Sequence, residues 1–551
     1  MRDNSMLIIY LTYFDMNCKK LLLIPVLCLF GALYAQFYPV IDLNDQGYAE
    51  SCTSIMVGKA ASTDGSVMTA QTCDANYRTW LRFEPSHAYQ PGEMEPVYWG
   101  MLHNEEPHDR RNVEKKGEIP APAKTYAFMN VAYPCMNEMQ LAIGETTTTG
   151  KRELVNKEGL FLIEELQRIA LQRCTTAREA IQLIGKLVAQ YGYGDSGECL
   201  TIADPQEVWH FEIYGSGTGK PAALWAAQRI PDDHVGISAN IPRIGKIDFS
   251  DSKNFMFSAD LRERSQKLGY WDGKEPYIFW KVVSSGTKAY AIREFFVLST
   301  LAPSLNLNME GEDLPFSVKP DHKVDVREIL AMYRQTYEGT PYDQMQNLSV
   351  TQTTRDREGN ETTETVTSPA TNNFMSNDMR NLLNALKPGS VERQRTIAIV
   401  ACSYSQIIQL RSWLPNEIGG IAYFAFDNPA QSPRIPIYSG TISLPQSFEV
   451  CGQHRYRTDA AIWSFREANR IATVNWARTR GIMEPEQMRL ENKLFSETPA
   501  LEAKAHSLIK EGKTEEAKQL LTSYTHDFAS TCMLKWEEMK ATFWALFARG
   551  F

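Results

Sequence analysis

The sequence predicts an α+β protein with layered antiparallel sheets and helices, followed by a helical C-terminal extension over 481–551. Short β-branched runs separated by turn residues occupy the start of the globular part, a pair of amphipathic helices follows, and strand-like runs then return. Strands, a helix pair and more strands in this order are typical of sheets covered by helices. A chain of 551 residues, 43% of them hydrophobic, is long enough to bury a large core.

The N-terminal residues have the pattern of an export signal. Lys19 and Lys20 precede an apolar run that ends in small residues, as in secretory signal peptides. Because this run is shorter than the ~20 residues of a membrane-spanning helix, no stable membrane anchor is expected. We predict a signal peptide over 1–35, a leader over 36–51 that is removed on maturation, and an exported protein, periplasmic or extracellular. Met16 is an alternative start.

Charge and cysteine content exclude several classes of function. The formal net charge is -9, and acidic and basic residues are mixed along the chain. Without a basic stripe, nucleic acid is not an expected partner. Loss of the signal peptide leaves eight of the ten cysteines, with no CxxC pair and no Cys/His cluster at metal-ligand spacing. We therefore expect neither a disulfide scaffold nor a structural zinc.

The chain after the leader opens with a predicted β-hairpin. The segments 53–58 and 66–72 are rich in β-branched and apolar residues, and a Thr-Asp-Gly turn signal at 63–65 separates them. Cys52 stands directly before the first strand. Taken alone, it is best explained as a buried strand residue, as most cysteines of globular proteins are.

Periodicity predicts the remaining elements. Apolar residues at helical spacing indicate helices over 160–170 and 176–191, and Thr175-Thr176 before Glu179 resembles a capping box. The polar segment at about 347–373 is interpreted as a solvated hairpin or a flexible insertion. Further strands are predicted at 199–203, 208–213, 222–228, 234–238, 396–402 and 420–426.

The run CTSIMVGKAASTDGS at 52–66 resembles the start of the mature PepD-type dipeptidases, which are N-terminal-nucleophile cysteine hydrolases related to secernins. More distantly, it is similar to penicillin V acylase and bile-salt hydrolase. The resemblance implies a hydrolase domain over 52–480, a four-layer αββα sandwich, no metal or organic cofactor, and small peptides as substrates. Other segments similar to the family are 136–138, 141–147, 202–205, 226–232, 237–240, 419–424 and 458–463.

Under this resemblance, Cys52 is the nucleophile of an acyl-enzyme cycle. A free cysteine has a pKa near ~8.5 and needs a base beside it. A free amino terminus, with a pKa near ~7.7 to 8, can accept the thiol proton and later pass it to the leaving amine. Such a mechanism requires that the bond between Ser51 and Cys52 is cut.

The resemblance also assigns roles to residues that would assist Cys52, according to their positions in the family's segments. Asp74 would orient the Cys52 amine and thiol, although an Asx-turn role fits it about equally well. Asn137 and Asn240 match asparagines that hydrogen-bond the oxyanion, with a turn asparagine as the alternative for both. Gln71 stands where the family often has an arginine. Stabilisation of the thiolate by such an arginine is therefore in doubt for this chain. Glu145 is the candidate partner for a substrate ammonium.

Two other functions remain open. One is an amide hydrolase of the penicillin acylase or bile-salt hydrolase type, and the other is a noncatalytic exported binding protein. A papain-like mechanism fits less well, because none of the nine histidines lies in a recognisable Cys/His triad context. The oligomeric state does not follow from the sequence.

Overall fold

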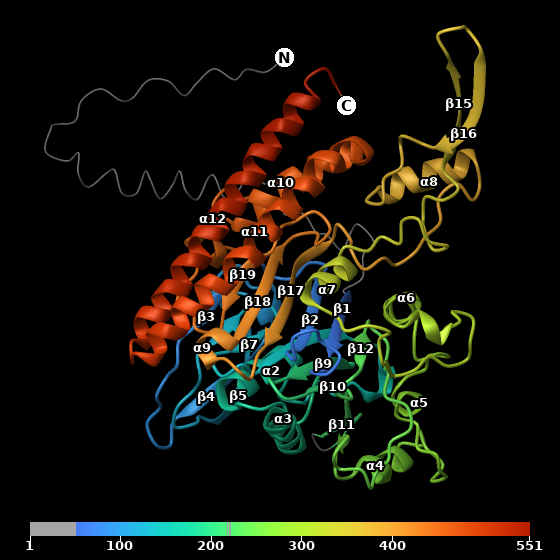
Figure 1. Cartoon of the computed structure of the whole chain (residues 1–551). Helices are drawn as coiled ribbons and strands as arrows, with labels where there is room; N and C mark the ends of the chain where they lie inside the picture. Colours follow the sequence, from blue (N-terminus) through green and yellow to red (C-terminus); the bar gives the residue numbers. More distant parts are fainter. Residues whose placement is uncertain (1–50, 218, 220–221, 551) are drawn as a thin grey trace, which may run out of the picture.

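Two antiparallel β-sheets lie at the centre of the computed structural model, which describes residues 51–217, 219 and 222–550 (Figure 1). One sheet has seven strands and the other has eight. Helices surround both sheets, so the α+β class predicted from the sequence is confirmed. The predicted signal peptide, and the leader as far as residue 50, lie outside the described residues.

The seven-stranded sheet holds the predicted N-terminal hairpin near its middle. β1 pairs with β2 so that Cys52 faces Cys73, and β12 pairs with the other edge of β1. The strand order is β14 (Ser317–Val318), β12 (Val235–Ser238), β1 (Ser51–Val57), β2 (Val67–Asp74), β17 (Cys402–Leu410), β18 (Gly420–Phe426) and β19 (Ile435–Tyr438).

The eight-stranded sheet contains the strands predicted after the helix pair. β8 pairs with β9 with Glu145 opposite Leu200 and Thr147 opposite Glu198. The strand order is β13 (Phe255–Phe257), β11 (Ala223–Arg229), β10 (Val208–Gly215), β9 (Glu198–Ala203), β8 (Ala142–Thr147), β7 (Met136–Asn137), β6 (Phe128–Asn130) and β3 (Arg82–Glu84).

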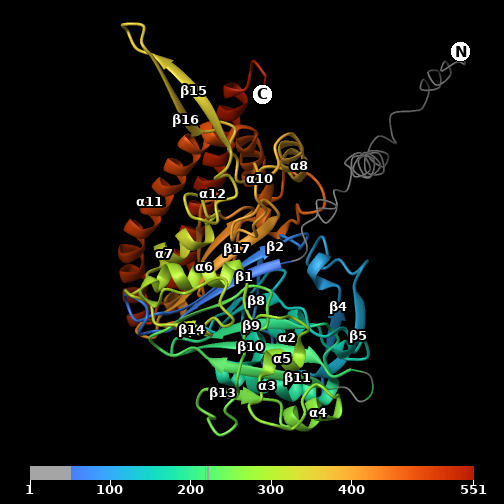
Figure 2. The same cartoon turned by 90° about the vertical axis from the view of Figure 1, so that its right-hand side faces the viewer.

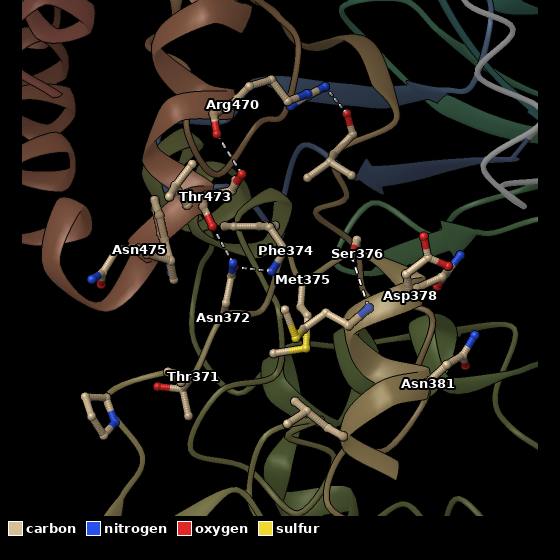
Figure 3. A pocket seen from close by; sticks show the side chains of 18 of the residues that line it. Thr371, Asn372, Phe374, Met375, Ser376, Asp378, Asn381, Arg470, Thr473 and Asn475 are labelled. Atoms are coloured by element: carbon tan, nitrogen blue, oxygen red, sulfur yellow. Dashed lines mark hydrogen bonds between the residues drawn. The ribbon is translucent and has the colours of Figure 1, made fainter. Parts of the chain in front are cut away.

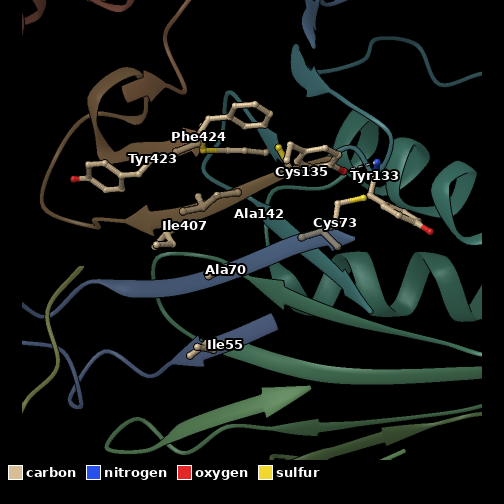
Figure 4. Close-up of a cluster of buried hydrophobic side chains, with 14 of the residues drawn as sticks. Ile55, Ala70, Cys73, Tyr133, Cys135, Ala142, Ile407, Tyr423 and Phe424 are labelled. Atoms are coloured by element: carbon tan, nitrogen blue, oxygen red, sulfur yellow. Dashed lines mark hydrogen bonds between the residues drawn. The ribbon is translucent and has the colours of Figure 1, made fainter. Parts of the chain in front are cut away.

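The main hydrophobic core lies where the two sheets meet. β1 and β2 of the first sheet contact β8 and β9 of the second. Figure 4 shows Ile55, Ala70 and Ile407 from the first sheet close to Ala142 from the second, and all four side chains are buried. β1, which carries Cys52, is thus held on one face by the other sheet and on both edges by neighbouring strands.

Helices pack on both sheets. α2 (Ile163–Arg173) contacts β6 and β7, and α3 (Ala177–Tyr191) contacts β9, β10 and β11. On the seven-stranded sheet, α10 (Ala461–Ala472) contacts β18 and α12 (Thr514–Leu546) contacts β19, while α11 (Trp476–Lys510) runs beside α12 (Figure 2). The described ranges contain no helix long and apolar enough to cross a membrane.

Smaller elements surround this centre. The polar segment forms an exposed hairpin of β15 (Ser349–Arg355) and β16 (Glu361–Thr367) that projects from the molecule (Figures 1 and 2). A second separate hairpin pairs β4 (Met94–Trp99) with β5 (Glu114–Pro120). The remaining helices are α4 (Leu261–Lys267), α5 (Phe279–Val283), α6 (Ile292–Leu301), α7 (Val326–Tyr333), α8 (Asn377–Leu386) and α9 (Asn416–Gly419).

The strand predicted at 396–402 is wrong for most of its length, because β17 begins only at Cys402. The preceding residues are mostly buried but irregular. Ala398 donates its backbone N–H to the carbonyl of Gln335, and the carbonyl of Ala401 accepts from the N–H of Ala75. A buried loop of this kind has the same apolar composition as a strand, so composition alone does not separate the two.

The capping box at the start of α3 provides a test of the local fold. Thr176 accepts a hydrogen bond from the backbone N–H of Glu179, whose side chain accepts from the backbone N–H of Thr176. We expect Thr176→Ala to lower the free energy of unfolding by about 1 kcal/mol, the usual value for a lost N-cap. Urea denaturation measures this loss. Thr351→Ala on the exposed β15 is the control and should change stability by less than ~0.5 kcal/mol.

Candidate active site

Cys52 lies where the pairing between β1 and β12 ends. The register places Ser54 opposite Ser238, and Asn240 follows two residues beyond that strand partner. The backbone N–H of Cys52 donates to Oδ1 of Asn240 at 3.1 Å. Because Ser51 is still attached, this nitrogen belongs to a peptide bond and occupies the place that an α-amine would have after cleavage.

Asn240 has the backbone and side-chain geometry of a positioning residue. Its φ of 67° lies in the left-handed region, which asparagine tolerates better than most residues. The side-chain Nδ2 donates to the carbonyl of Thr147 at 2.7 Å. The same side chain therefore joins the end of β8 to the backbone nitrogen of Cys52.

Arg293 on α6 is a site residue that sequence reasoning missed. Its guanidinium donates to the carbonyl of Cys52 at 2.7 Å and to Oδ1 of Asn240 at 2.8 Å. Burial, followed by repulsion from Arg395, lowers the pKa of Arg293 to about 10, so it remains a cation at neutral pH. The available signal was a charged residue within the apolar run IREFFVLSTL of α6.

The Cys52 thiol is fully buried beside an acid. Its Sγ lies 3.4 Å from Oε2 of Glu145, which also accepts from Nε2 of Gln71 at 3.2 Å. Burial first, then the neighbouring Cys73, Glu145 and Asp74, raise the pKa of Cys52 well above its ordinary value. The thiol is therefore protonated at neutral pH in this structure, and a role as a nucleophile would require a base.

Asp74 lies next to Ser51, the residue that precedes Cys52. It faces Ser51 in the register of β1 and β2, and Nη2 of Arg395 donates to Oδ2 of Asp74 at 2.6 Å and to Oγ of Ser51 at 2.7 Å. The other carboxylate oxygen, Oδ1, is buried and has no hydrogen-bond partner within the described part of the chain. Asp74 thus retains an acceptor close to the Ser51–Cys52 bond.

Asn137 lies at the end of β7, next to the end of α2. Its contacts do not fit the oxyanion role expected from the resemblance. Its Nδ2 donates to the carbonyls of Leu171 and Cys174 at 2.7 and 2.9 Å, which uses both amide hydrogens. Its Oδ1 accepts from the backbone N–H groups of Met139 and Leu141. The side chain ties a turn to the end of α2, so we assign it a structural role.

A large cavity in the described part of the chain is distinct from this site. It has a volume of about 1230 Å³ and lies between α8 with its preceding loop and the start of α11 (Figure 3). Asn372 and Thr473 both line the cavity, and Nδ2 of Asn372 donates to the carbonyl of Thr473 at 2.6 Å. None of the predicted site residues lines it. No group of three or more His, Cys, Asp or Glu side chains able to hold a metal occurs in the described ranges.

Comparison with known proteins identifies the family of the chain. The family model described as peptidase family C69 matches residues 51–488, and the match begins one residue before Cys52. The chain belongs to peptidase family C69. A match over most of the chain, including both sheets, extends the resemblance that the sequence analysis found around Cys52.

Several proteins similar to this C69 chain have names that state an activity. A probable dipeptidase of Latilactobacillus sakei is 24% identical over 427 residues, which cover 74% of this chain and 78% of the relative. Dipeptidase A of Lactobacillus helveticus is 23% identical over 483 residues, covering 85% and 90%. A probable dipeptidase of Salmonella dublin is 24% identical over 417 residues, covering 73% and 83%.

Replacement of Arg293 tests whether its hydrogen bonds hold the backbone around Cys52 and Asn240 in place. Arg293→Met would leave the carbonyls of Cys52 and Ala239 and Oδ1 of Asn240 without this donor. We expect the free energy of unfolding to fall by about 3 kcal/mol or more, since each buried unpaired acceptor costs ~1 to 3 kcal/mol. Urea denaturation measures the change. The exposed Arg327→Met is the matched control, and equal effects of the two variants would contradict the assigned role.

Proposed function

We propose that the protein is a dipeptidase that forms an acyl-enzyme on Cys52 after the Ser51–Cys52 bond is cut. The observation that carries this proposal is the position of Cys52, with its backbone nitrogen on Asn240 and its thiol beside Glu145. Membership of peptidase family C69 and relatives named dipeptidases support the reaction and the substrate class.

Cleavage would convert the Cys52 nitrogen from an amide with one hydrogen into an amine with a lone pair. Oδ1 of Asn240 already accepts from this nitrogen. The free Oδ1 of Asp74 could accept a further hydrogen, which would orient the lone pair towards the thiol. The α-amine then acts as the general base for the otherwise protonated thiol.

In the proposed cycle, the Cys52 thiolate attacks the scissile carbonyl and the α-amine passes the proton to the departing amine. The amide of Asn240 uses one hydrogen for the carbonyl of Thr147 and keeps the second for the oxyanion. Water then attacks the thioester and releases the acyl residue. Asn137 takes no part, because both of its amide hydrogens are engaged.

Fold and export form part of the same proposal. Two packed sheets with helices α2 and α3 on one and α10 and α12 on the other are consistent with the αββα sandwich of N-terminal-nucleophile hydrolases. The signal-like sequence over 1–35 supports export to the periplasm or beyond, where the leader over 36–51 would be removed.

Replacement of the nucleophile tests this proposal. Cys52→Ala should abolish hydrolysis of L-alanyl-L-alanine and, if cleavage is autocatalytic, the purified protein should keep Ser51. Cys52→Ser should be processed more slowly, because a hydroxyl is the weaker nucleophile. Intact-mass analysis and a ninhydrin assay measure the two effects. The buried Cys532→Ala on α12 is the matched control and should be processed and active.

Two further measurements separate the proposal from its rivals. Incubation with EDTA should leave the rate unchanged, and a loss restored by a divalent metal would contradict the mechanism. Faster cleavage of N-acetyl-L-alanyl-L-alanine or of penicillin V than of the free dipeptide would favour an acylase. Fully active protein that still carries Ser51 would exclude an N-terminal nucleophile.

The amide of Asn240 is tested by a pair of variants. Asn240→Ala and Asn240→Gly both remove the side-chain hydrogen bonds, but glycine adopts the positive φ of this position without strain. We expect both to lower kcat by about 100-fold or more, the usual effect of losing an oxyanion donor. Only Asn240→Ala should also lose stability to backbone strain. A glycine variant with wild-type kcat would show that the amide is dispensable.

A further inference from the structure

Cys73 on β2 is a buried thiol that the proposed cycle does not use. It is paired directly opposite Cys52 in the antiparallel ladder of β1 and β2, so the two side chains lie on the same face of the sheet. Both residues are fully buried. Burial first, and then a hydrogen bond with Cys73, raise the pKa of Cys52, in agreement with two thiols in contact. A second sulfur therefore lies beside the one to which we assign the chemistry.

The backbone hydrogen bonds of Cys52 show which kind of pair this is. Its N–H donates to Oδ1 of Asn240 and its carbonyl accepts from Arg293, so both groups point to the edge of β1 that faces β12. The N–H of the next residue points the other way and donates to Oγ1 of Thr72 on β2. Cys52 and Cys73 are therefore a non-hydrogen-bonded pair, the kind in which opposite side chains stand closest.

The spacing of such a pair fits a disulfide. Its Cα atoms are about 4.5 Å apart, within the ~4.4 to 6.8 Å found across disulfides. Its Cβ atoms also lie at about 4.5 Å, the upper end of the ~3.5 to 4.5 Å that a disulfide spans. A bond between the two sulfurs therefore needs only a slight approach of two strands that are already paired.

The two thiols differ in reactivity. Burial raises the pKa of Cys73 to about 12, although a hydrogen bond with Cys52 opposes the rise, so Cys73 is protonated at neutral pH. Peroxides react with the thiolate form of cysteine. In the mature enzyme, the amine that activates Cys52 for a substrate would also supply the thiolate for a peroxide. Hydrogen peroxide is smaller than any dipeptide that must reach the same sulfur, so oxidation begins at Cys52.

We infer that Cys52 and Cys73 form a reversible disulfide when a peroxide oxidises the mature enzyme, and that Cys73 thereby protects Cys52 from irreversible oxidation. The inference rests on the proposed function, because it needs a Cys52 thiolate that small molecules can reach. The disulfide stops hydrolysis, since the sulfur of Cys52 is no longer a nucleophile. It also prevents oxidation to sulfinic and sulfonic acids, which thiols do not reverse.

Two steps lead to this disulfide. In the first, the O–O bond of hydrogen peroxide breaks, the Cys52 sulfur takes one oxygen to become a sulfenic acid, and the departing hydroxide takes the proton held by the α-amine. In the second, the Cys73 thiol attacks the sulfenic sulfur, the S–O bond breaks, and the hydroxyl leaves as water with the Cys73 proton. One peroxide is reduced to two waters, and the two thiols are oxidised to one disulfide.

Peptide mapping of the processed wild-type enzyme tests the linkage directly. Tryptic cleavage puts Cys52 in the peptide 52–59 and Cys73 in the peptide 60–78, with no other cysteine in either. The enzyme is treated with excess hydrogen peroxide, free thiols are blocked with N-ethylmaleimide, and the peptides are analysed without reductant. We expect the two peptides to be joined. Tandem mass spectra distinguish oxygen on Cys52 from oxygen on Met56.

Recovery of activity towards L-alanyl-L-alanine is the second measurement. Dithiothreitol should restore at least about half of the activity that peroxide removes from the wild type, but less than about a tenth in Cys73→Ala, whose Cys52 proceeds to sulfinic acid. Each recovery is compared with the untreated rate of the same protein, so a change in basal activity does not affect it. Cys532→Ala, which removes a buried thiol on α12, is the matched control and should recover like the wild type.

The outcomes separate this inference from the proposed function. Sulfinic acid on Cys52 of the wild type without the linkage, or equal recovery of Cys73→Ala and wild type, would overturn the disulfide while leaving a dipeptidase. A fully linked enzyme that still hydrolyses the dipeptide at its untreated rate would instead overturn Cys52 as the nucleophile. Since the wild-type map needs no variant, a Cys73→Ala chain that fails to fold does not remove the test.

Discussion

The arrangement of the site depends on the buried guanidinium of Arg293. It holds the carbonyl of Cys52, the carbonyl of Ala239 and the side chain of Asn240 at one point, where β12 ends and β1 continues. Burying a cation is unfavourable unless its donors are satisfied, and these acceptors meet that condition. The backbone of Cys52 is therefore fixed by a hydrogen-bond network from three distant segments, and its position does not depend on the thiol itself.

Charge is distributed unevenly around Cys52. Arginines 293 and 395 contact the backbone of Cys52 and the side chains of Ser51 and Asp74, whereas the acids Glu145 and Glu198 lie on the side of the thiol. Burial, and after it Cys73, Glu145 and Asp74, disfavour the thiolate and raise the pKa of Cys52.

Sequence reasoning succeeded where the signal is local. The β1–β2 hairpin and the helices α2 and α3 follow from periodicity over fewer than twenty residues, and the Thr176 cap follows from one short motif. Arg293 could not be found in this way, because its partner Cys52 lies 241 residues away in the chain. Only the folded sheet brings the two together.

Asn137 and Asn240 show a second limit of prediction from the sequence. Asn240 follows a strand-like run and Asn137 lies in the family-like segment 136–138, but the amide of either can cap a turn or bind an oxyanion. Which role applies depends on the acceptors that surround the amide, and these come from α2 for Asn137 and from β8 for Asn240. The irregular segment before β17 has the same cause, since its partners Gln335 and Ala75 are remote in sequence.

If the Ser51–Cys52 bond is cut as we propose, the position of Ser51 has a consequence for the order of folding and cleavage. Ser51 belongs to β1, is 9% exposed, and faces Asp74 across the ladder. A separate protease must draw several residues on each side of a bond into its own cleft, whereas Ser51 and Cys52 are buried and paired with Asp74 and Cys73 of β2. The atoms of Cys52 itself, in contrast, are already adjacent to the bond once the sheet has formed. Steric shielding would thus make correct assembly a condition for cutting, so that a misassembled chain would remain without its reactive amine.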